Sequence, residues 1–381
     1  MLKRVVALGI LILVAAPLSG FAQTMGESGM MKRTKQNEHQ QGGDDYIQTN
    51  LVSNLASLNP PAKLVDPDLV NPWGVAFFPD GPFWISDNGT GVSTLYDGVG
   101  NSISQAIGLT VTIPADGDNS AGAPGPDGIV WNGNPLAFAV GNPAAAALFI
   151  FATEDGTIAA WQPALGNTAA IVVPNSNLTT GPVYKGLALG NNSRGLFLYA
   201  TDFRDAKVIA WNSTFGFDAQ LSAKFADSHI PNGFAPFGIQ NLNGQLWVSY
   251  AKQDGPRHDP VAGEGNGFVD VFDTDGNLIR RFASNGVLNA PWGMVLAPNN
   301  FGQFSNDILI GNFGDGKISA WDLKDGRFID WMRDTHERPL ALGSLWALVF
   351  GGGLNASPQT LYFTTGLENE TNGLFGTLSP E

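Results

Sequence analysis

Oxygen-bearing side chains recur along this chain at two places in a repeated pattern of strands and turns. One place is the turn that leads into the first strand of each repeat, and the other is the turn after the second strand. Carboxylates and amides at such turns can coordinate a cation, bind a polar ligand, or bond to nearby backbone. The candidate binding residues are Asn71, Asp87, Asn88, Lys185, Asp202, His258, Asn312 and Glu368, with Asp127, Asp254, Arg257, Asp259, Asn289, Asp315 and Glu370 beside them.

Three of these residues, Asp87, Asp202 and Asn312, are the predicted ligands of a metal ion. Ca²⁺ takes about six to eight oxygen atoms from carboxylates, amides and water, so these residue types suit a single Ca²⁺ held between several repeats. The alternative is that each side chain caps its own turn by bonding nearby backbone groups. The sequence leaves both interpretations open.

His258 indicates a different chemistry. It lies between Arg257 and Asp259 in the loop of residues 253–267, and its unperturbed pKa near neutrality would suit a general base. The alternative is a solvated loop residue. The sequence contains no Gly-x-Ser-x-Gly elbow, no phosphate-binding Gly/Lys loop, no His-Glu-x-x-His motif and no cysteine. It therefore favours binding over catalysis and leaves enzymatic activity undecided.

A repeat of about 55 residues must position these side chains. Each repeat begins with a turn and a glycine, continues with an apolar second strand, and adds a third strand that often ends in an aromatic residue. The aligned positions are Gly74, Gly128, Gly186, Gly238, Gly293 and Ala347. Six such repeats predict an all-β fold, a six-bladed β-propeller.

The two ends of the repeat region are expected to meet. The last repeat has no room for a fourth strand after residues 373–378, whereas residues 46–55 form a strand-like segment without a repeat of its own. Adding this N-terminal strand to the last blade would close the ring and leave no open edge. Both kinds of turn then open on one face, so the candidate residues should gather at the mouth of the central channel.

The chain before the repeats divides into two parts. Residues 1–22 combine Lys3 and Arg4 with an apolar run and small residues up to Ala22, which predicts a signal peptide. A transmembrane anchor is the alternative, although the run is shorter than the roughly 20 apolar residues that span a bilayer. Residues 23–45 form a polar spacer, expected to be disordered, and residues 46–381 the propeller domain. We expect a secreted or periplasmic protein with no membrane span after cleavage.

The charge of the chain limits its partners. Asp and Glu number 34 against 20 for Lys and Arg, which gives a net charge of −14. Nucleic acid and anionic membrane surfaces require a basic protein surface and are therefore disfavoured. We expect a small molecule, a glycan or a protein segment at the channel mouth.

The repeats resemble those of NHL-type propellers. The pattern is Pro-x-Gly, two apolar strands of which the second ends in Asp or Asn, and then Gly-x-Val/Ile-x-x-Trp/Tyr-Asp, clearest in residues 291–322 and 72–97. From residue 46 on, the chain also resembles a family of exported bacterial proteins of unknown function, and this resemblance implies a six-bladed propeller without implying an activity. A more distant similarity is to the gluconolactonase and senescence-marker family, six-bladed hydrolases with one divalent cation in the channel.

Two functions remain open. The first is an exported binding or scaffold module that holds a ligand of unknown identity at the channel mouth. The second is a Ca-dependent hydrolase of the lactonase or esterase type, with a metal on the propeller axis. The missing catalytic motifs favour the first function, and the oxygen-rich turns keep the second open.

Overall fold

The computed structural model describes residues 45–116, 124–175 and 180–381. The predicted signal peptide and all but the last residue of the predicted spacer lie outside these ranges. The described part consists mainly of β-strands, with the short helices α1 (Ile103–Ile107) and α2 (Ala219–Ser222) and the 3-10 turns η1 (Pro163–Leu165) and η2 (Gly302–Phe304). None of the helices in the described ranges is long and apolar enough to cross a membrane.

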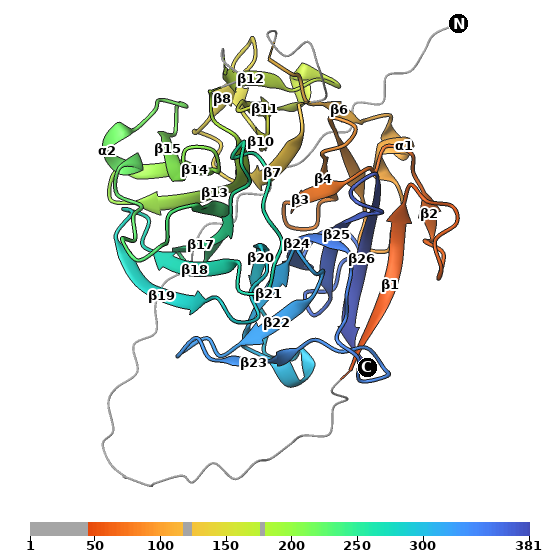
Figure 1. Cartoon of the computed structure of the whole chain (residues 1–381). Coiled ribbons are helices and arrows are strands. Elements are labelled where there is room, and N and C mark those ends of the chain that lie inside the picture. Colours follow the sequence, from red (N-terminus) through yellow and green to blue (C-terminus); the bar gives the residue numbers. More distant parts are fainter. Residues whose placement is uncertain (1–44, 117–123, 176–179) are drawn as a thin grey trace, which may run out of the picture. The chain divides into compact units, whose positions relative to one another are not determined.

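Six sheets, antiparallel except for one short edge strand, form the blades (Figure 1). Blade 1 contains β3 (Pro72–Ala76), β4 (Phe83–Asp87), β5 (Val92–Tyr96) and β6 (Val111–Thr112). Blade 2 contains β7 (Pro126–Trp131), β10 (Phe149–Thr153), β11 (Ile158–Trp161) and β12 (Ala170–Val173), with a side hairpin of β8 (Ala139–Val140) and β9 (Ala145–Ala146). Blade 3 contains β13 (Tyr184–Asn192), β14 (Gly195–Asp202) and β15 (Lys207–Asn212), against which α2 packs.

The remaining three blades follow the same order of strands. Blade 4 contains β16 (Phe234–Leu242), β17 (Gln245–Lys252), β18 (Gly267–Phe272) and β19 (Leu278–Ser284). Blade 5 contains β20 (Pro291–Leu296), β21 (Ile308–Asn312), β22 (Ile318–Trp321) and β23 (Phe328–Trp331). Blade 6 contains β24 (Ser344–Phe350), β25 (Leu361–Leu367), β26 (Asn372–Pro380), β1 (Tyr46–Ser53) and β2 (Leu64–Val65).

The ring closes through its first strand. β1 pairs antiparallel with β26, with Tyr46 opposite Pro380 and Ser53 opposite Leu374, and β2 adds a short parallel edge to β1 (Figure 1). The innermost strands contact one another in the cyclic order β3, β7, β13, β16, β20, β24 and back to β3. The predicted six-bladed propeller, closed by an N-terminal strand, is therefore confirmed.

The aligned glycines lie where each inner strand touches the next. A Cβ atom at Gly238 would lie 2.2 Å from the carbonyl oxygen of Trp292 in blade 5, and one at Gly293 would lie 2.4 Å from that of Trp346 in blade 6. Every inner strand also shifts its register at this point, as a β-bulge does. Because a bulge re-aims the residues within it, the residue before each aligned position can face the axis.

Aromatic side chains fill the spaces between blades. Trp84 of blade 1 stacks on Phe149 of blade 2, with ring centroids 4.2 Å apart. Trp161, Trp211 and Trp321, which share one position in the repeat, are each at most 5% exposed. These rings hold neighbouring blades together by burying apolar surface, and they are not platforms for a ligand.

We predict that Gly238→Ala strongly destabilises the propeller. The new methyl group would meet the backbone of blade 5, which cannot move aside as a flexible side chain could. A loss of about 3 kcal/mol or more in the free energy of unfolding is expected, at the upper end of the usual overpacking cost. Urea unfolding measures it, with Gly255→Ala as the matched control because a Cβ there meets nothing within 4 Å. Equal stability of the two variants would contradict this role of the glycine.

Candidate functional site

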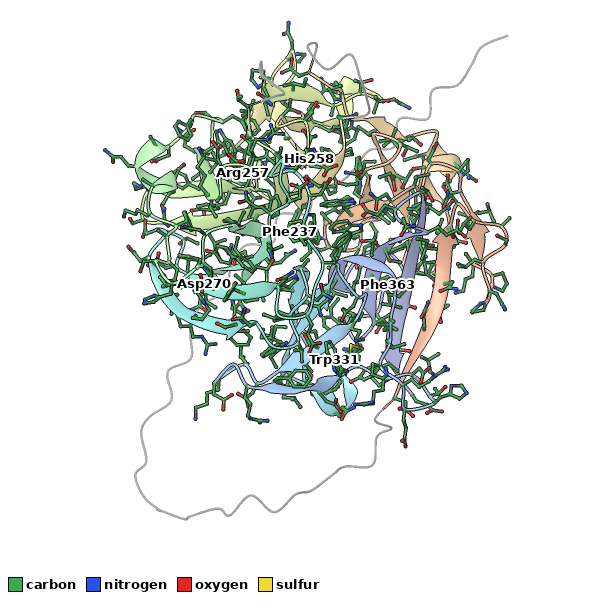
Figure 2. The ribbon with its side chains drawn as sticks, in the orientation of Figure 1. Phe237, Arg257, His258, Asp270, Trp331 and Phe363 are labelled. Carbon is green, nitrogen blue, oxygen red and sulfur yellow. The ribbon has the colours of Figure 1, made fainter. Side chains whose placement is uncertain are left out.

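Six residues, one from each inner strand, directly precede the aligned positions and surround the axis. They are Trp73, Asp127, Lys185, Phe237, Trp292 and Trp346. The four aromatic members pack across the channel: Trp73 stacks on Trp346 at a centroid distance of 3.4 Å, and Trp292 lies edge-on to both at 6.0 Å. Phe237 completes the group near the middle of the ring (Figure 2).

The other two axial positions hold a buried acid and a buried base. Asp127 and Lys185 are both 0% exposed. The Lys185 ammonium forms an ion pair with Glu154, lies 3.7 Å from an oxygen of Asp259, and sits 5.0 Å from the centre of the Trp73 ring. Within the described ranges, Oδ2 of Asp127 has no hydrogen-bond partner. An ammonium group and a carboxyl group thus occupy the two axial positions that the four aromatic side chains do not.

Burial and charge shift the pKa values of this pair. Burial and the neighbouring Glu154 carboxylate raise the pKa of Asp127 well above its ordinary value. Burial alone would lower the pKa of Lys185, but Glu154, Asp259 and Asp127 outweigh it, and the pKa is raised. Lys185 therefore stays charged at neutral pH.

The ion pair of Lys185 with Glu154 connects Lys185 to a larger polar cluster at the channel mouth, which we call the axial network. Asp127, whose Oδ1 accepts the N–H of Gly128, joins this network through its charge interactions with Glu154 and Lys185. Asn71 Nδ2 donates to Asn88 at 3.2 Å and to Glu370 at 3.0 Å, and Asn88 Nδ2 donates to Glu154 at 2.9 Å. Trp346 Nε1 donates to Asn71 Oδ1 at 3.0 Å, which ties the network to the aromatic side chains below it. The axial network consists of Asn71, Asn88, Asp127, Glu154, Lys185, His258, Asp259 and Glu370.

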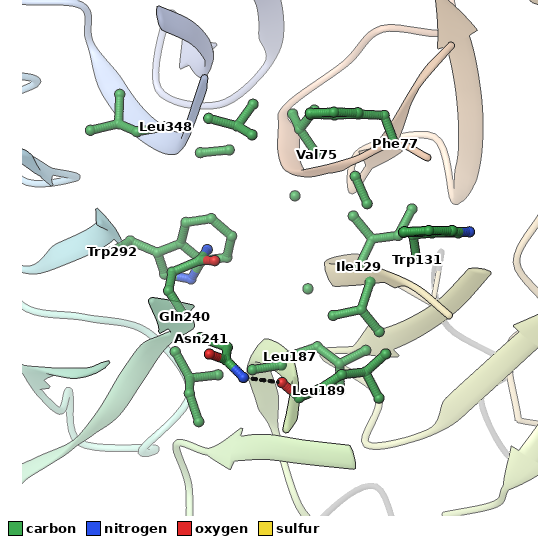
Figure 3. A pocket seen from close by; sticks show the side chains of 18 residues that line it. Val75, Phe77, Ile129, Trp131, Leu187, Leu189, Gln240, Asn241, Trp292 and Leu348 are labelled. Carbon is green, nitrogen blue, oxygen red and sulfur yellow. Dashed lines mark hydrogen bonds between the residues drawn. The ribbon is translucent and has the colours of Figure 1, made fainter. Parts of the chain in front are cut away.

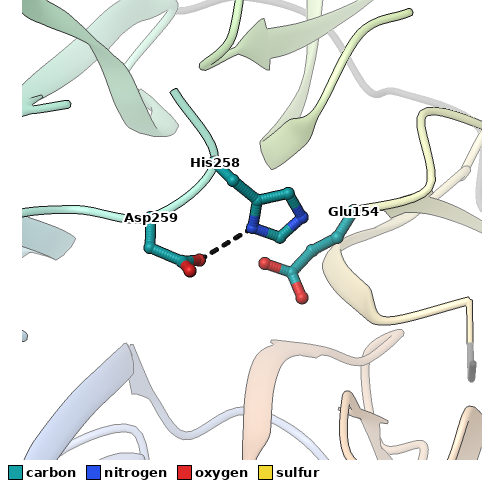
Figure 4. A group of neighbouring side chains, drawn as sticks. All are labelled: Glu154, His258 and Asp259. Carbon is teal, nitrogen blue, oxygen red and sulfur yellow. Dashed lines mark hydrogen bonds and ion pairs between the residues drawn. The ribbon is translucent and has the colours of Figure 1, made fainter. Parts of the chain in front are cut away.

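Glu154, His258 and Asp259 form the accessible part of the axial network (Figure 4). Their side chains are 18%, 38% and 65% exposed, respectively. His258 Nδ1 lies 2.8 Å from Asp259 Oδ1, and this contact, reinforced by Lys185, lowers the pKa of Asp259. One ligand atom from each of the three residues lies within 4.8 Å of the others. The arrangement can bind a cation, or use an imidazole oriented by a carboxylate to move a proton.

The structure brings four of the eight predicted binding residues together. Asn71, Asn88, Lys185 and His258 belong to the axial network, as do Asp127, Asp259 and Glu370 from the wider candidate set. Asp87, Asp202, Asn312 and Glu368 do not.

The three predicted metal ligands bond to turns or strands beside them. Asp87 is fully buried, and its Oδ2 accepts from the backbone and hydroxyl of Thr94. Asp202 Oδ1 accepts N–H groups of its own blade, and Asn312 Oδ1 accepts the N–H of Asn289 at 3.1 Å. These contacts match the capping alternative, and a role in metal binding stays a prediction.

Glu368 was predicted to be a binding residue but lies outside the axial network, whereas Glu154 was not predicted but lies within it. The Glu368 carboxylate accepts from Asn372 in its own turn and is not part of the axial network. Glu154 belongs to the network but was not among the candidates. The repeat carries a signal for Glu154, because it directly follows β10 as Asn88 directly follows β4. The last residues of these two strands, Thr153 and Asp87, pair with prolines at equivalent positions of the inner strands, Pro126 and Pro72.

The far end of the channel has a different character. It contains a cavity of about 280 Å³ lined by the inner strands of all six blades (Figure 3). Most of the side chains there are apolar, among them Val75, Ile129, Leu187 and Leu348, with Gln240 and Asn241 on one side. The charged groups of the channel are therefore concentrated at its mouth.

The fold and the axial network define a six-bladed propeller with a polar site at one end of its channel. No family model matches the chain. It belongs to the same family as two uncharacterized proteins of Acanthamoeba polyphaga mimivirus. One is 32% identical over 336 residues, 86% of this chain and 78% of the relative, and the other is 32% identical over 342 residues, 86% and 84%. These relatives are viral, so the expected bacterial origin of the family is not supported, and the NHL-like character of the repeats stays an interpretation.

Solved structures support the fold alone. Virginiamycin B lyase from Staphylococcus aureus superposes with a TM-score of 0.50 at 13% identity, covering 88% of this chain and 99% of the lyase. A glucose dehydrogenase gives a TM-score of 0.51 at 12% identity, covering 82% and 97%. At such identities no activity can be carried over to this chain.

We predict that Asp202→Asn flattens the pH dependence of stability. Burial raises the pKa of Asp202 to about 6, with part of the effect offset by N–H donors from Asp205 and Val183. In the unfolded chain this carboxyl ionises near pH 4, so between about pH 4 and 6 only the folded state keeps the proton, and stability falls as the pH rises. Asparagine keeps the acceptor oxygen and cannot ionise. Above pH 6, the free energy of unfolding of the variant should therefore exceed that of the parent by about 1–2 kcal/mol.

Urea unfolding between pH 4 and 8 tests this prediction. Asp325→Asn, at an exposed turn of blade 5, is the control and should follow the parent profile. If Asp202→Asn shows the parent slope as well, the buried carboxyl does not contribute to the pH dependence.

Proposed function

We propose that this protein is an exported binding module whose axial network holds a small, positively charged ligand at the channel mouth. The observation that carries this proposal is the excess of carboxylates in the network. Even without Asp127, whose burial favours its neutral form, Glu154, Asp259 and Glu370 stand against a single permanent cation, Lys185. The Glu154 and Asp259 side chains are 18% and 65% exposed, and a cationic group placed between their carboxylates would offset the remaining negative charge.

Preorganisation of the network supports a ligand site. Side chains from several blades are already linked by hydrogen bonds, and a buried oxygen of Asp127 lacks a partner in the part of the chain that the structure describes. Buried polar groups normally have partners, because leaving one unsatisfied costs about 1–3 kcal/mol. A small amine, or the Lys or Arg side chain of a protein segment, has the chemistry that such a site binds.

A metal-dependent hydrolase is the second candidate, and the convergence of Glu154, His258 and Asp259 favours it. An imidazole ligand suits Zn²⁺ or Mn²⁺ better than Ca²⁺, which prefers oxygen. The ion pair between Lys185 and Glu154 disfavours this candidate more than the first, because the ammonium group repels a divalent metal ion about twice as strongly as a singly charged organic cation at the same distance. Binding of an organic cation therefore remains the first proposal.

We predict that organic cations raise the melting temperature of the full chain through His258 and Asp259. Arginine, choline and spermidine are titrated against glucose, CaCl₂ and ZnCl₂ in a thermal-shift experiment, followed by calorimetry. At about a hundredfold excess over the dissociation constant, a bound ligand stabilises the folded state by about 2.7 kcal/mol. His258→Ala and Asp259→Asn should each weaken binding at least about tenfold.

His336→Ala is the matched control for this experiment. His336 is an exposed histidine beside a carboxylate, Asp334, but lies outside the axial network. It should leave binding unchanged. Stabilisation by ZnCl₂ alone, lost in His258→Ala, would replace the first candidate by the second, and stabilisation by glucose alone would exclude both.

A further inference from the structure

A second cavity lies between blades 3 and 4, beside the axial network and apart from it. Its volume is about 540 Å³, within the range of small-molecule sites. Phe225, Ile230 and Phe234 supply apolar walls, and Tyr250 lines it from β17. The loop after β17 adds Gln253 and Arg257.

Among the described residues that line this cavity, Arg257 carries the one charge without a partner. Asp227 lines it too, but its carboxylate shares Arg281 with Asp270 and accepts the backbone N–H of His229 at 2.8 Å. In the described part of the chain, the Arg257 guanidinium forms no hydrogen bond or ion pair, and only the backbone N–H of Arg257 is bonded, to Asp254. An anion in this cavity would therefore meet one unshared cation.

The loop that carries Arg257 is held firmly in place. Asp254 N donates to Asp259 O at 3.0 Å, and Asp254 Oδ1 accepts the N–H of His258 at 2.8 Å. Gln253 Nε2 anchors the base of the loop by donating to Phe203 O. Arg257 has a φ of 59°, a left-handed conformation that is strained for a residue with a side chain. The surrounding bonds maintain this conformation, which places Arg257 at the cavity, while the adjacent His258 lies beside Asp259 and Glu154 (Figure 4).

We propose that this cavity is a second binding site, which takes a small organic carboxylate with an apolar or aromatic body. The planar guanidinium of Arg257 matches a carboxylate through two parallel hydrogen bonds. The apolar body of the ligand packs against Phe225, Ile230 and Phe234. Binding at this site requires no ligand in the axial network, so the proposal can be tested independently of the function proposed above.

Binding of benzoate, phenylacetate and hexanoate to the full chain tests the proposal, with benzyl alcohol as the neutral analogue. Calorimetry gives the affinity, and saturation-transfer NMR shows contact of the ligand body with protein. Arg257→Asn removes the guanidinium while asparagine tolerates the left-handed backbone, so the loop should keep its shape. We expect at least one carboxylate to bind, benzyl alcohol to bind at least tenfold more weakly, and Arg257→Asn to lose at least tenfold in carboxylate affinity.

Two controls separate this site from others. Arg338→Ala removes an exposed arginine that pairs with Asp334 and should bind carboxylates like the parent. His258→Ala should also keep carboxylate binding, because the imidazole belongs to the axial network. Equal affinity for benzoate and benzyl alcohol, loss of binding in His258→Ala but not in Arg257→Asn, or no binding of any probe would overturn the proposal.

Discussion

Close backbone contact between inner strands is the constraint on which the rest of this propeller depends. At four of the five aligned glycines a Cβ atom would lie 2.2–2.5 Å from the backbone of the next blade, and at Gly186 it would lie 3.0 Å from it. The same contact leaves one residue per blade to face the axis. Four of these six residues are aromatic and fill the channel, and the two that remain, Asp127 and Lys185, bring charge to the channel. The position of the candidate site is thus a consequence of how the ring closes around itself.

Lys185 links the stability of the ring to the chemistry of the site. A buried ammonium group is tolerated only with compensation, which Glu154 and Asp259 provide from two other blades. Both carboxylates also face the solvent side of the network, where a ligand would compete with Lys185 for them. A ligand bound there would therefore change the environment of the buried Lys185 ammonium group. Through this ion pair, it would also change the interaction between the blades that Lys185 and its partners connect.

The number of blades and the closure of the ring could be predicted from the sequence, because each blade repeats the same pattern of a glycine, apolar strands and turns. The site could be predicted only in part. Asp87 and Asn88 are neighbours in sequence, yet the first bonds to Thr94 in its own blade and the second joins the axial network, because adjacent residues at the end of a strand point in different directions. From the sequence pattern, both residues were equally good candidates for the binding site. Glu154 occupies the position in blade 2 that Asn88 occupies in blade 1, so the repeat itself carries a signal for it. The place of His258 depends on loop bonds made by Asp254.

The pairing of β1 with β26 sets how the propeller responds to mechanical load. Tyr46 lies opposite Pro380, so the two ends of the described domain sit side by side on antiparallel strands. A force that pulls these ends apart breaks the strand-to-strand hydrogen bonds one after another, from Tyr46 towards Ser53, and does not load them all at once. Tethering by both ends would therefore open the ring at low force.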